Sequence, residues 1–422
     1  MADKVFLCID LKSFYASVEC VDRGLDPFKT NLVVADPARG KGGICLAITP
    51  AMKELGIHNR CRIFEIPNHV RYITALPRMK HYMDVSAQIY GIYLTFVSPD
   101  DIHPYSIDEV FIDTTNYLHI YNKTPKEMAV MLMDAVMEKT GICASAGIGT
   151  NMFLAKVALD ITAKHTPDHI GYLDISEFER TLWHHRPVTD IWNIGHGTAK
   201  RLEKYGIFDL YGIARCDEQL LYKEFGVNAE FLIDHAHGRE TCEIADIHSY
   251  KSKTASLSNS QILFSDYTFD EALVCLKEMI DMLTLELVER HMVASGIALR
   301  IGYSRDIVPS TGGTEKLPEK TSSYDKLVKR FEYLYRKTTQ KNVPIRKLSI
   351  GFTDILDEDH TSLQIDLFSD RKQDEKERKI QEAVLAIKHK FGKNALLRGM
   401  SYTDKATARI RNKLIGGHNG GQ

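Results

Sequence analysis

The sequence lacks close cysteine pairs, long apolar runs and a strong net charge, and each absence narrows the function. Its eight cysteines are scattered through 422 residues, and none forms a CxxC pair. This pattern excludes CxxC zinc knuckles, and a disulfide framework is not expected at this length. We therefore expect a reduced, cytoplasmic protein.

No apolar stretch approaches the roughly 20 residues of a membrane-spanning helix, so no membrane partner is expected. The apolar run near the N-terminus is short and is interrupted by Asp10 and Lys12, unlike a signal peptide. A formal charge of −2 means that any nucleic-acid surface is local. With 44% hydrophobic residues, the chain can form two to four domains with ordinary cores.

Three acidic residues stand at the ends of predicted strands. Asp10 ends the apolar run 5–9, while Asp108 and Glu109 precede the β-prone run 110–112. Adjacent acids in apolar surroundings are costly to bury unless a cation lies against them. Three such acids predict a divalent-metal site for phosphoryl transfer, if these segments meet. In a straight strand Asp108 and Glu109 would face opposite sides, so both reach one site only where the backbone turns.

The order of the expected strands and helices predicts a ferredoxin-like sheet. Short strands at 32–36 and 44–48 flank a loop, and Thr49 with Pro50 predicts the start of a short helix. This order suggests a split βαβ fold in which residues 24–81 form a small inserted lobe. The other expected elements are strands at 5–10 and 142–148, a hairpin around the two acids, and helices at 13–20, 82–96, 125–140 and 151–164.

A glycine-rich turn before a basic helix is the second functional signal. Residues 191–207 contain an Ile-Gly-His-Gly turn and then a helix that we expect Thr198 to cap and Gly206 to end. This helix-hairpin-helix pattern lets backbone N–H groups approach a phosphate without reading sequence. A structural αα-hairpin that binds nothing is the alternative. The residues expected to contact a nucleic acid are Gly195, Gly197, Thr198 and Lys200.

Four motifs together resemble the Y-family DNA polymerases, enzymes that copy damaged templates. Each motif is modest alone, but their collinear order through much of the N-terminal half is specific. The C-terminal part is most similar to the UmuC-like bacterial branch. The motifs are Asp10-Leu-Lys-Ser-Phe-Tyr-Ala16, Ser106-Ile-Asp-Glu109, Ala146-Gly-Ile-Gly-Thr-Asn-Met-Phe-Leu-Ala-Lys156 and Ile194-Gly-His-Gly197.

The resemblance implies an α+β multidomain protein. Its parts would be a ferredoxin-like palm (1–23 and 82–170), a small fingers lobe (24–81), a helical thumb with the helix-hairpin-helix (171–247), a split βαβ little finger (248–356) and a C-terminal tail (357–422). Within the last two parts we expect strands near 254–264, 294–303 and 346–354, helices at 268–291, 322–340 and 374–391, and a disordered glycine-rich stretch at 416–421.

The resemblance also implies a role for the acids. Asp10, Asp108 and Glu109, with the carbonyl group of Leu11, would hold two Mg²⁺ ions, for which Mn²⁺ can substitute. Asp108 would bridge both ions, and Glu109 would serve the ion at the primer end. Tyr15 would be the steric gate, whose ring occupies the place of a ribose 2′-hydroxyl.

Cationic and backbone groups would hold the triphosphate of the incoming nucleotide. The implied groups are the backbone N–H groups of Lys12, Ser13, Phe14 and Tyr15 and the side chains of Lys53 and Lys164. Pro50 departs from the family, where a hydrogen-bonding side chain is common, and this puts one phosphate contact in doubt. Lys53 is a point charge rather than a bidentate fork.

Two further regions would contact partners. Basic residues on the little-finger strands, including Arg300 and Arg346, would grip primer and template in a salt-sensitive way. Gln364, Leu367 and Phe368 would anchor a sliding-clamp peptide at 364–368.

These features predict a template-directed, low-fidelity translesion DNA polymerase, acting in the DNA-damage (SOS) response. Low fidelity is expected because no segment has the size and acid pattern of a proofreading exonuclease. Primer-template DNA, deoxynucleoside triphosphates, the sliding clamp and an accessory damage-response subunit are the candidate partners. One alternative is another palm-fold nucleotidyl transferase, such as a nucleotide cyclase, which would not need the hairpin or the clamp peptide. The other is a catalytically silent DNA-binding scaffold at stalled forks, against which the intact acids argue.

Overall fold

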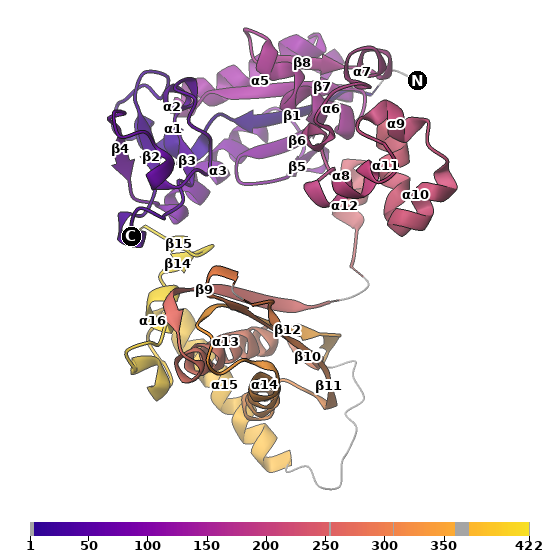
Figure 1. Cartoon of the computed structure of the whole chain (residues 1–422). Helices are drawn as coiled ribbons and strands as arrows, with labels where there is room; N and C mark the ends of the chain where they lie inside the picture. Colours follow the sequence, from indigo (N-terminus) through magenta and orange to yellow (C-terminus); the bar gives the residue numbers. More distant parts are fainter. Residues whose placement is uncertain (1–3, 253–254, 307, 359–370, 422) are drawn as a thin grey trace. The chain divides into compact units, whose positions relative to one another are not determined.

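The computed structural model describes residues 4–252, 255–306, 308–358 and 371–421. The chain divides into two compact units (Figure 1), which are Met1–Tyr250 with His418–Gln422 and Lys251–Gly417. Within the described residues, no helix has the length and apolar character needed to cross a membrane.

A five-stranded sheet forms the centre of the first unit, with the order β5-β6-β1-β7-β8. Neighbouring strands pair antiparallel except β7 and β8, which are parallel. Its strands are β1 (Phe6–Leu11), β5 (Ile102–Pro104), β6 (Glu109–Asp113), β7 (Ala144–Gly149) and β8 (Ile170–Leu173). The predicted first strand and the hairpin around the acids are therefore confirmed, with β1 at the centre of the sheet and β5 at its edge.

Helix α6 (Met152–Asp160) packs closely on the sheet because β7 carries two glycines. A Cβ atom on Gly147 would lie 2.0 Å from the Ala155 carbonyl oxygen, and one on Gly149 would lie 2.2 Å from the Ala155 nitrogen. The helix ends at Asp160 rather than at the predicted Lys164. Lys164 instead lies on the 3-10 helix η4 (Thr162–His165).

The remaining helices of the palm follow the predicted order. The helix predicted at 82–96 begins three residues earlier, and the helix predicted at 125–140 has the predicted bounds, with Thr124 as its cap and Gly141 in the left-handed conformation at its end. These helices are α1 (Phe14–Val21), α3 (Met79–Tyr93), α4 (Thr115–Tyr121) and α5 (Pro125–Thr140). Together with α6 they complete the predicted α+β palm.

The inserted lobe has a small sheet of its own with the order β3-β2-β4. Its elements are β2 (Leu32–Val34), β3 (Ala47–Ile48), helix α2 (Pro50–Glu54) and β4 (Ile73–Ala75). Thr49 occupies the N-cap position of α2 and Pro50 begins the helix, as predicted, but the Thr49 hydroxyl accepts a 3.1 Å bond from the Leu32 N–H rather than from an N–H of the helix. The lobe surrounds a buried cluster that includes Val33, Cys45 and Ile48.

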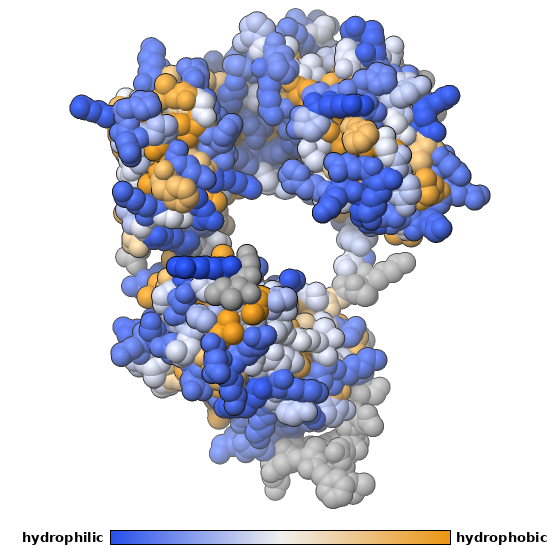
Figure 2. Space-filling model, viewed as in Figure 1, coloured by the Kyte–Doolittle hydropathy of each residue, from blue (hydrophilic) through white to orange (hydrophobic). Residues whose placement is uncertain are grey.

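The thumb is helical, as predicted. Its helices are α7 (Ile175–Leu182), α8 (His196–Glu203), α9 (Leu210–Ala214), α10 (Glu218–Phe225), α11 (Ala229–Ala236) and α12 (Ile244–Ser249). The expected cap is wrong, because Gly195 occupies the N-cap position of α8 and Thr198 lies inside the helix. Figure 2 shows apolar residues reaching the surface over this helical region, and Phe231 and Val227 are among the exposed ones.

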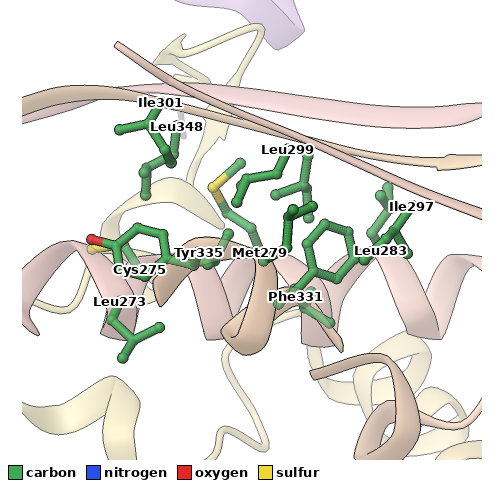
Figure 3. Close-up of a cluster of buried hydrophobic side chains, with 14 of the residues drawn as sticks. Leu273, Cys275, Met279, Leu283, Ile297, Leu299, Ile301, Phe331, Tyr335 and Leu348 are labelled. Atoms are coloured by element: carbon green, nitrogen blue, oxygen red, sulfur yellow. The ribbon is translucent and has the colours of Figure 1, made fainter. Parts of the chain in front are cut away.

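The second unit contains the predicted second split βαβ sheet, with the order β11-β10-β12-β9. Its elements are β9 (Leu257–Tyr267), α13 (Phe269–Glu289), β10 (Met292–Tyr303), β11 (Thr311–Thr321), α14 (Tyr324–Thr338), β12 (Ile345–Thr353) and the short β13 (Leu356–Asp357). The strand β11 was not predicted. Helices α13 and α14 cover one face of the sheet, and Figure 3 shows their side chains meeting Leu299, Ile301 and Leu348 in the core.

The C-terminal part is more ordered than the sequence suggested. Helix α15 (Arg371–Phe391) contacts α13, and it is followed by the short helix α16 (Ala408–Arg411) and the strands β14 (Leu414–Ile415) and β15 (His418–Asn419). The glycine-rich stretch is not disordered, since the Lys80 N–H donates a 2.8 Å bond to the Gly420 carbonyl. The predicted tail 357–422 thus belongs mostly to the second unit and, in its last residues, to the first.

Candidate active site

The three predicted acids lie on adjacent segments of the palm sheet. Asp10 on β1 stands opposite Glu109 on β6 in the antiparallel register, so both side chains leave the same face. Asp108 precedes β6 in a bend, where the Ser106 hydroxyl donates a 2.7 Å bond to its carboxylate. The Leu11 N–H donates to the Asp108 carbonyl at 2.9 Å. The backbone therefore turns at Asp108, as it must if Asp108 and Glu109 are to reach the same site.

The carboxyl of Asp10 is strongly perturbed by this arrangement. Burial and the nearby charges of Asp108 and Glu109 together raise the pKa of Asp10 to about 7, while Lys156 acts in the opposite direction. The structure thus brings the three acids within electrostatic reach of one another. Their combined negative charge is incompletely balanced by the protein.

Glu109 is held by two residues that the sequence analysis did not predict. Its side chain is only 10% exposed, accepts a 3.0 Å bond from the thiol of Cys8 and forms a 2.8 Å ion pair with Lys156 on α6. Lys156 also pairs with Asp160 at 2.9 Å. Burial lowers the pKa of Lys156, but Asp160 and Glu109 raise it by more, so it stays a cation. Its position in the third motif, one helical turn before Asp160, was the available signal.

The carboxylates of Asp10, Asp108 and Glu109 are suitable ligands for a divalent cation, although their side chains do not converge on a single position. Among the described residues, no group of three or more histidine, cysteine or acidic side chains is arranged to hold a metal ion. Glu109 points to Lys156 and Cys8 instead. Carboxylate oxygens are hard ligands of the kind that Mg²⁺ prefers. The pKa of Asp10 is raised by burial and by the negative charge of Asp108 and Glu109, and a divalent cation would neutralise that charge.

Tyr15 lies at the N-terminal end of α1, beside the acids. Burial raises the pKa of the Tyr15 hydroxyl, Asp108 raises it further and Arg60 opposes them, which places the ring near Asp108. Its ring stacks on that of Tyr82, another residue that the sequence did not single out, with centroids 4.6 Å apart. The preceding Phe14 is only 2% exposed and belongs to the core.

The N–H groups at the start of α1 are only partly free to bind a ligand. The first helical bond runs from the Ser17 N–H to the Ser13 carbonyl at 3.0 Å, so the N–H groups of Ser13, Phe14 and Tyr15 precede it. The predicted contribution of the Lys12 N–H is wrong, because that group donates to the Cys143 carbonyl at 2.9 Å.

Lys53 of α2 and Lys164 of η4 reach the same region. Partial burial of the ammonium group lowers the pKa of Lys53, the charge of Lys164 lowers it further, and Asp10 and Asp108 oppose these effects. Lys53 therefore lies within electrostatic reach of Asp10 and Asp108, and of Lys164 from a distant part of the chain. The role of Lys53 and Lys164 as triphosphate ligands stays a prediction.

The turn at the start of α8 leaves space around Gly195 and Gly197. A Cβ atom on Gly195 or Gly197 would meet no other atom within 4 Å, so packing within the described residues does not explain why they are glycines. Lys200 is exposed, whereas Arg201 forms a 2.8 Å ion pair with Glu224. The open turn and Lys200 remain available to an external phosphate.

The face of the second sheet that α13 and α14 leave uncovered carries Arg300. Its register partner is Ser349, and the neighbouring β12 residue on that face is Lys347, which is exposed. Arg346 is placed differently, at an irregularity of the ladder, and lies 3.8 Å from Asp266. The clamp peptide predicted at 364–368 lies outside the described residues.

The chain is similar to known proteins along nearly its whole length. Residues 9–160 match the impB/mucB/samB family model and residues 254–367 match the model of its C-terminal domain. The chain is 33% identical over 417 residues to "Putative UV-damage repair protein UvrX" of Bacillus subtilis (strain 168), covering 98% of this chain and 97% of that protein.

Two further similarities cover similar lengths. The chain is 30% identical over 425 residues to "DNA polymerase IV 2" of Bacillus subtilis (strain 168), covering 99% of both chains. A solved Y-family DNA polymerase chimera has the same fold, with a TM-score of 0.64 at 22% identity over 83% of this chain and 99% of that one. The chain belongs to the impB/mucB/samB family and is thus a Y-family DNA polymerase.

Proposed function

We propose that this protein extends a primer past damaged template bases by a two-metal-ion mechanism. The observation that carries the proposal is the half-buried Asp10, because burial and the neighbouring Asp108 and Glu109 raise its pKa to about 7. A protein that keeps three acids together in this way is suited to bind cations during its reaction. Membership of the DNA polymerases supplies the reaction in which such cations act.

Asp10, Asp108 and Glu109, together with the Leu11 carbonyl, would hold two Mg²⁺ or Mn²⁺ ions. When bound, these ions lower the pKa of the primer 3′-hydroxyl and offset charge on the leaving pyrophosphate. Asp108 has its carbonyl fixed by the Leu11 N–H and its carboxylate by Ser106, so its side chain is oriented before ligands arrive.

Glu109 has a different environment, and we assign it a different role. Lys156 and the Cys8 thiol hold its carboxylate in place while the site is free. This pairing keeps a buried negative charge satisfied, which would otherwise be costly. Serving a cation at the primer end requires Glu109 to share its oxygens between Lys156 and the metal.

The incoming deoxynucleoside triphosphate would lie between Tyr15 and the two lysines. Lys53 is supported as a triphosphate ligand by its electrostatic interactions with Asp10 and Asp108, and Lys164 is supported by its interaction with Lys53. The N–H groups of Ser13, Phe14 and Tyr15 lie at the positive end of α1 and can add hydrogen bonds. Tyr15 would act as the steric gate against ribonucleotides.

Primer-template DNA would be held by two surfaces. Gly195, Gly197, Thr198 and Lys200 are proposed to bind one backbone, because the turn is open and Lys200 is exposed. On the second sheet Arg300 has the better support, and the ion-paired position of Arg346 weakens its case. We further propose that 364–368 binds the sliding clamp, that an accessory subunit assists and that the enzyme serves the SOS response.

Primer extension on a defined template with Mg²⁺ tests the catalytic proposal. The wild-type chain should add deoxynucleotides, and Asp108→Ala should lower the rate by about 1,000-fold or more while still binding the same DNA. Asp100→Ala, a change at an exposed acid of the 3-10 helix η3 (Pro99–Asp101), is the matched control and should extend normally. A wild-type chain that shifts primer-template DNA but extends nothing would favour the scaffold alternative.

A further inference from the structure

Behind Tyr15 lies a second tyrosine that covers one face of its ring. Tyr82 of α3 stacks on Tyr15 with centroids 4.6 Å apart and ring planes inclined by 17°. Tyr82 is 0% exposed, whereas Tyr15 is half-buried. The ring of Tyr15 therefore rests against a side chain that is itself enclosed by the core.

The hydroxyl of Tyr82 is fixed to the same helix that carries Tyr15. It donates a 2.7 Å hydrogen bond to Glu19, which lies four residues after Tyr15 on α1. Residues four positions apart lie on one face of a helix. Tyr82 thus contacts α1 twice, through its ring at Tyr15 and through its hydroxyl at Glu19, and these two contacts fix the ring in both position and tilt.

Glu19 holds the Tyr82 hydroxyl strongly because its buried side chain remains an ionised carboxylate. Its side chain is 0% exposed and also accepts bonds from Arg78 Nε at 2.8 Å and from Arg23. Burial raises the pKa of Glu19, but the bonds from Arg78, Tyr82 and Arg23 lower it by more. A phenol that donates to an ionised carboxylate forms a stronger bond than one that donates to a neutral acceptor.

We propose that Tyr82 is a positioning residue for sugar discrimination, which holds the Tyr15 ring against displacement by a ribonucleoside triphosphate. The proposal rests on the proposed function, in which Tyr15 is the gate. A gate excludes a 2′-hydroxyl only if its ring resists moving away. The stacked ring and the Glu19 anchor block the direction in which Tyr15 would retreat.

The test measures single-nucleotide insertion by the full chain on an undamaged primer-template, with each deoxynucleotide and its ribonucleotide. Tyr82→Leu should lower the ratio of the two kcat/KM values by about three- to ten-fold, as for the loss of one aromatic pair. The change should come from faster ribonucleotide insertion, with deoxynucleotide kcat/KM within about two-fold of wild type. Tyr82→Phe keeps the ring and loses only the hydroxyl, so its ratio of kcat/KM values should lie between those of wild type and Tyr82→Leu.

The matched control is Tyr335→Leu in the core of the second unit. Tyr335 is also 0% exposed, its ring packs on Phe269 with centroids 4.6 Å apart, and its hydroxyl donates a 2.8 Å bond to the Phe269 carbonyl. The change removes the same atoms from a buried aromatic pair that is far from Tyr15 in the sequence, and it should leave the ratio unchanged. Circular dichroism of each variant separates a loss of fold from a change of selectivity, and Tyr82→Phe, with the smallest loss of volume, keeps the test available if Tyr82→Leu does not fold.

The double variant Tyr15→Ala/Tyr82→Leu decides whether Tyr82 acts through the gate. If it does, the double variant should match Tyr15→Ala alone, because the second change has nothing left to position. Additive effects would overturn the proposal, and so would wild-type selectivity in both Tyr82 variants. If Tyr15→Ala itself leaves the ratio unchanged, the gate assignment and this inference both fail, while deoxynucleotide insertion in the same assay still reports on the polymerase.

Discussion

At the scale of single residues, ionised Asp10 should destabilise the folded, metal-free protein. Burial and two neighbouring acids raise its pKa to about 7. Between about pH 4 and pH 7 the folded, metal-free protein therefore binds more protons than the unfolded chain. The free energy of unfolding should fall as the pH rises through this range, and it should level off above it.

Asp10→Asn should remove this pH dependence and stabilise the metal-free protein at pH 8 by about 1–3 kcal/mol. The same variant should lose primer extension, because an amide is a weak metal ligand. Urea unfolding in EDTA at pH 5 and pH 8 measures the first effect, with the exposed Asp100→Asn as the control. Equal pH slopes for wild type and Asp10→Asn would contradict the assignment.

At the scale of elements, one substitution at the start of α8 should have opposite effects on the stability of the thumb and on its binding of DNA. Gly197 lies in the first turn of this helix, and a Cβ atom there would meet no other atom within 4 Å. Gly197→Ala should stabilise the thumb by up to about 1 kcal/mol, because alanine favours helix over glycine. If a phosphate approaches this turn, the same methyl group should weaken primer-template binding several-fold.

Thermal unfolding and fluorescence anisotropy measure these two opposite effects. Gly206 offers a contrasting control, since its φ of +70° favours glycine. Gly206→Ala should therefore destabilise the thumb without a direct effect on the DNA contact. A Gly197→Ala protein that binds DNA as tightly as wild type would remove the turn from the proposed DNA surface.

Most elements were predictable because their apolar patterns and caps are local. The strand β11 was missed since Thr311–Thr321 contains two glycines and a proline and few apolar residues, and only its pairing with β10 makes it a strand. The cap of α8 was misplaced because the sequence offers Thr198, while the helix already begins at His196.

The site was predictable in its acids and lysines, but not in what surrounds them. Asp10, Asp108 and Glu109 stand out by charge in apolar segments, and sequence order places them on one sheet. The pairing of Glu109 with Lys156 depends on how α6 packs on the sheet. The stacking of Tyr15 on Tyr82 depends on how α3 packs against α1. Contacts of this kind join distant parts of the chain, so no local pattern reveals that Lys156 pairs with Glu109 or that Tyr82 stacks on Tyr15.

At the scale of the whole molecule, the proposed clamp peptide lies between two folded segments. The sheet and β13 precede it, and α15 follows it. Deleting 364–368 should therefore leave distributive synthesis within about two-fold of wild type, and should abolish stimulation by the clamp. Single-turnover extension with and without added clamp checks both, and equal stimulation of the deletion and wild type would refute the motif.

A matched variant sharpens this test. Replacing 364–368 by five glycine or serine residues keeps the length of the connection between the two folded segments and removes only the side chains. The replacement and the deletion should lose stimulation equally. If only the deletion does, the length of the segment matters rather than its sequence.

The two glycines of β7 have a consequence for how the enzyme can be inactivated. They let α6 approach to within contact of the strand, and α6 carries the lysine that holds Glu109. A single added methyl group at Gly147 or Gly149 must displace the helix, with every acid of the site left intact. A genetic screen for loss of lesion bypass should therefore recover small-to-large changes at this strand alongside changes at the acids themselves.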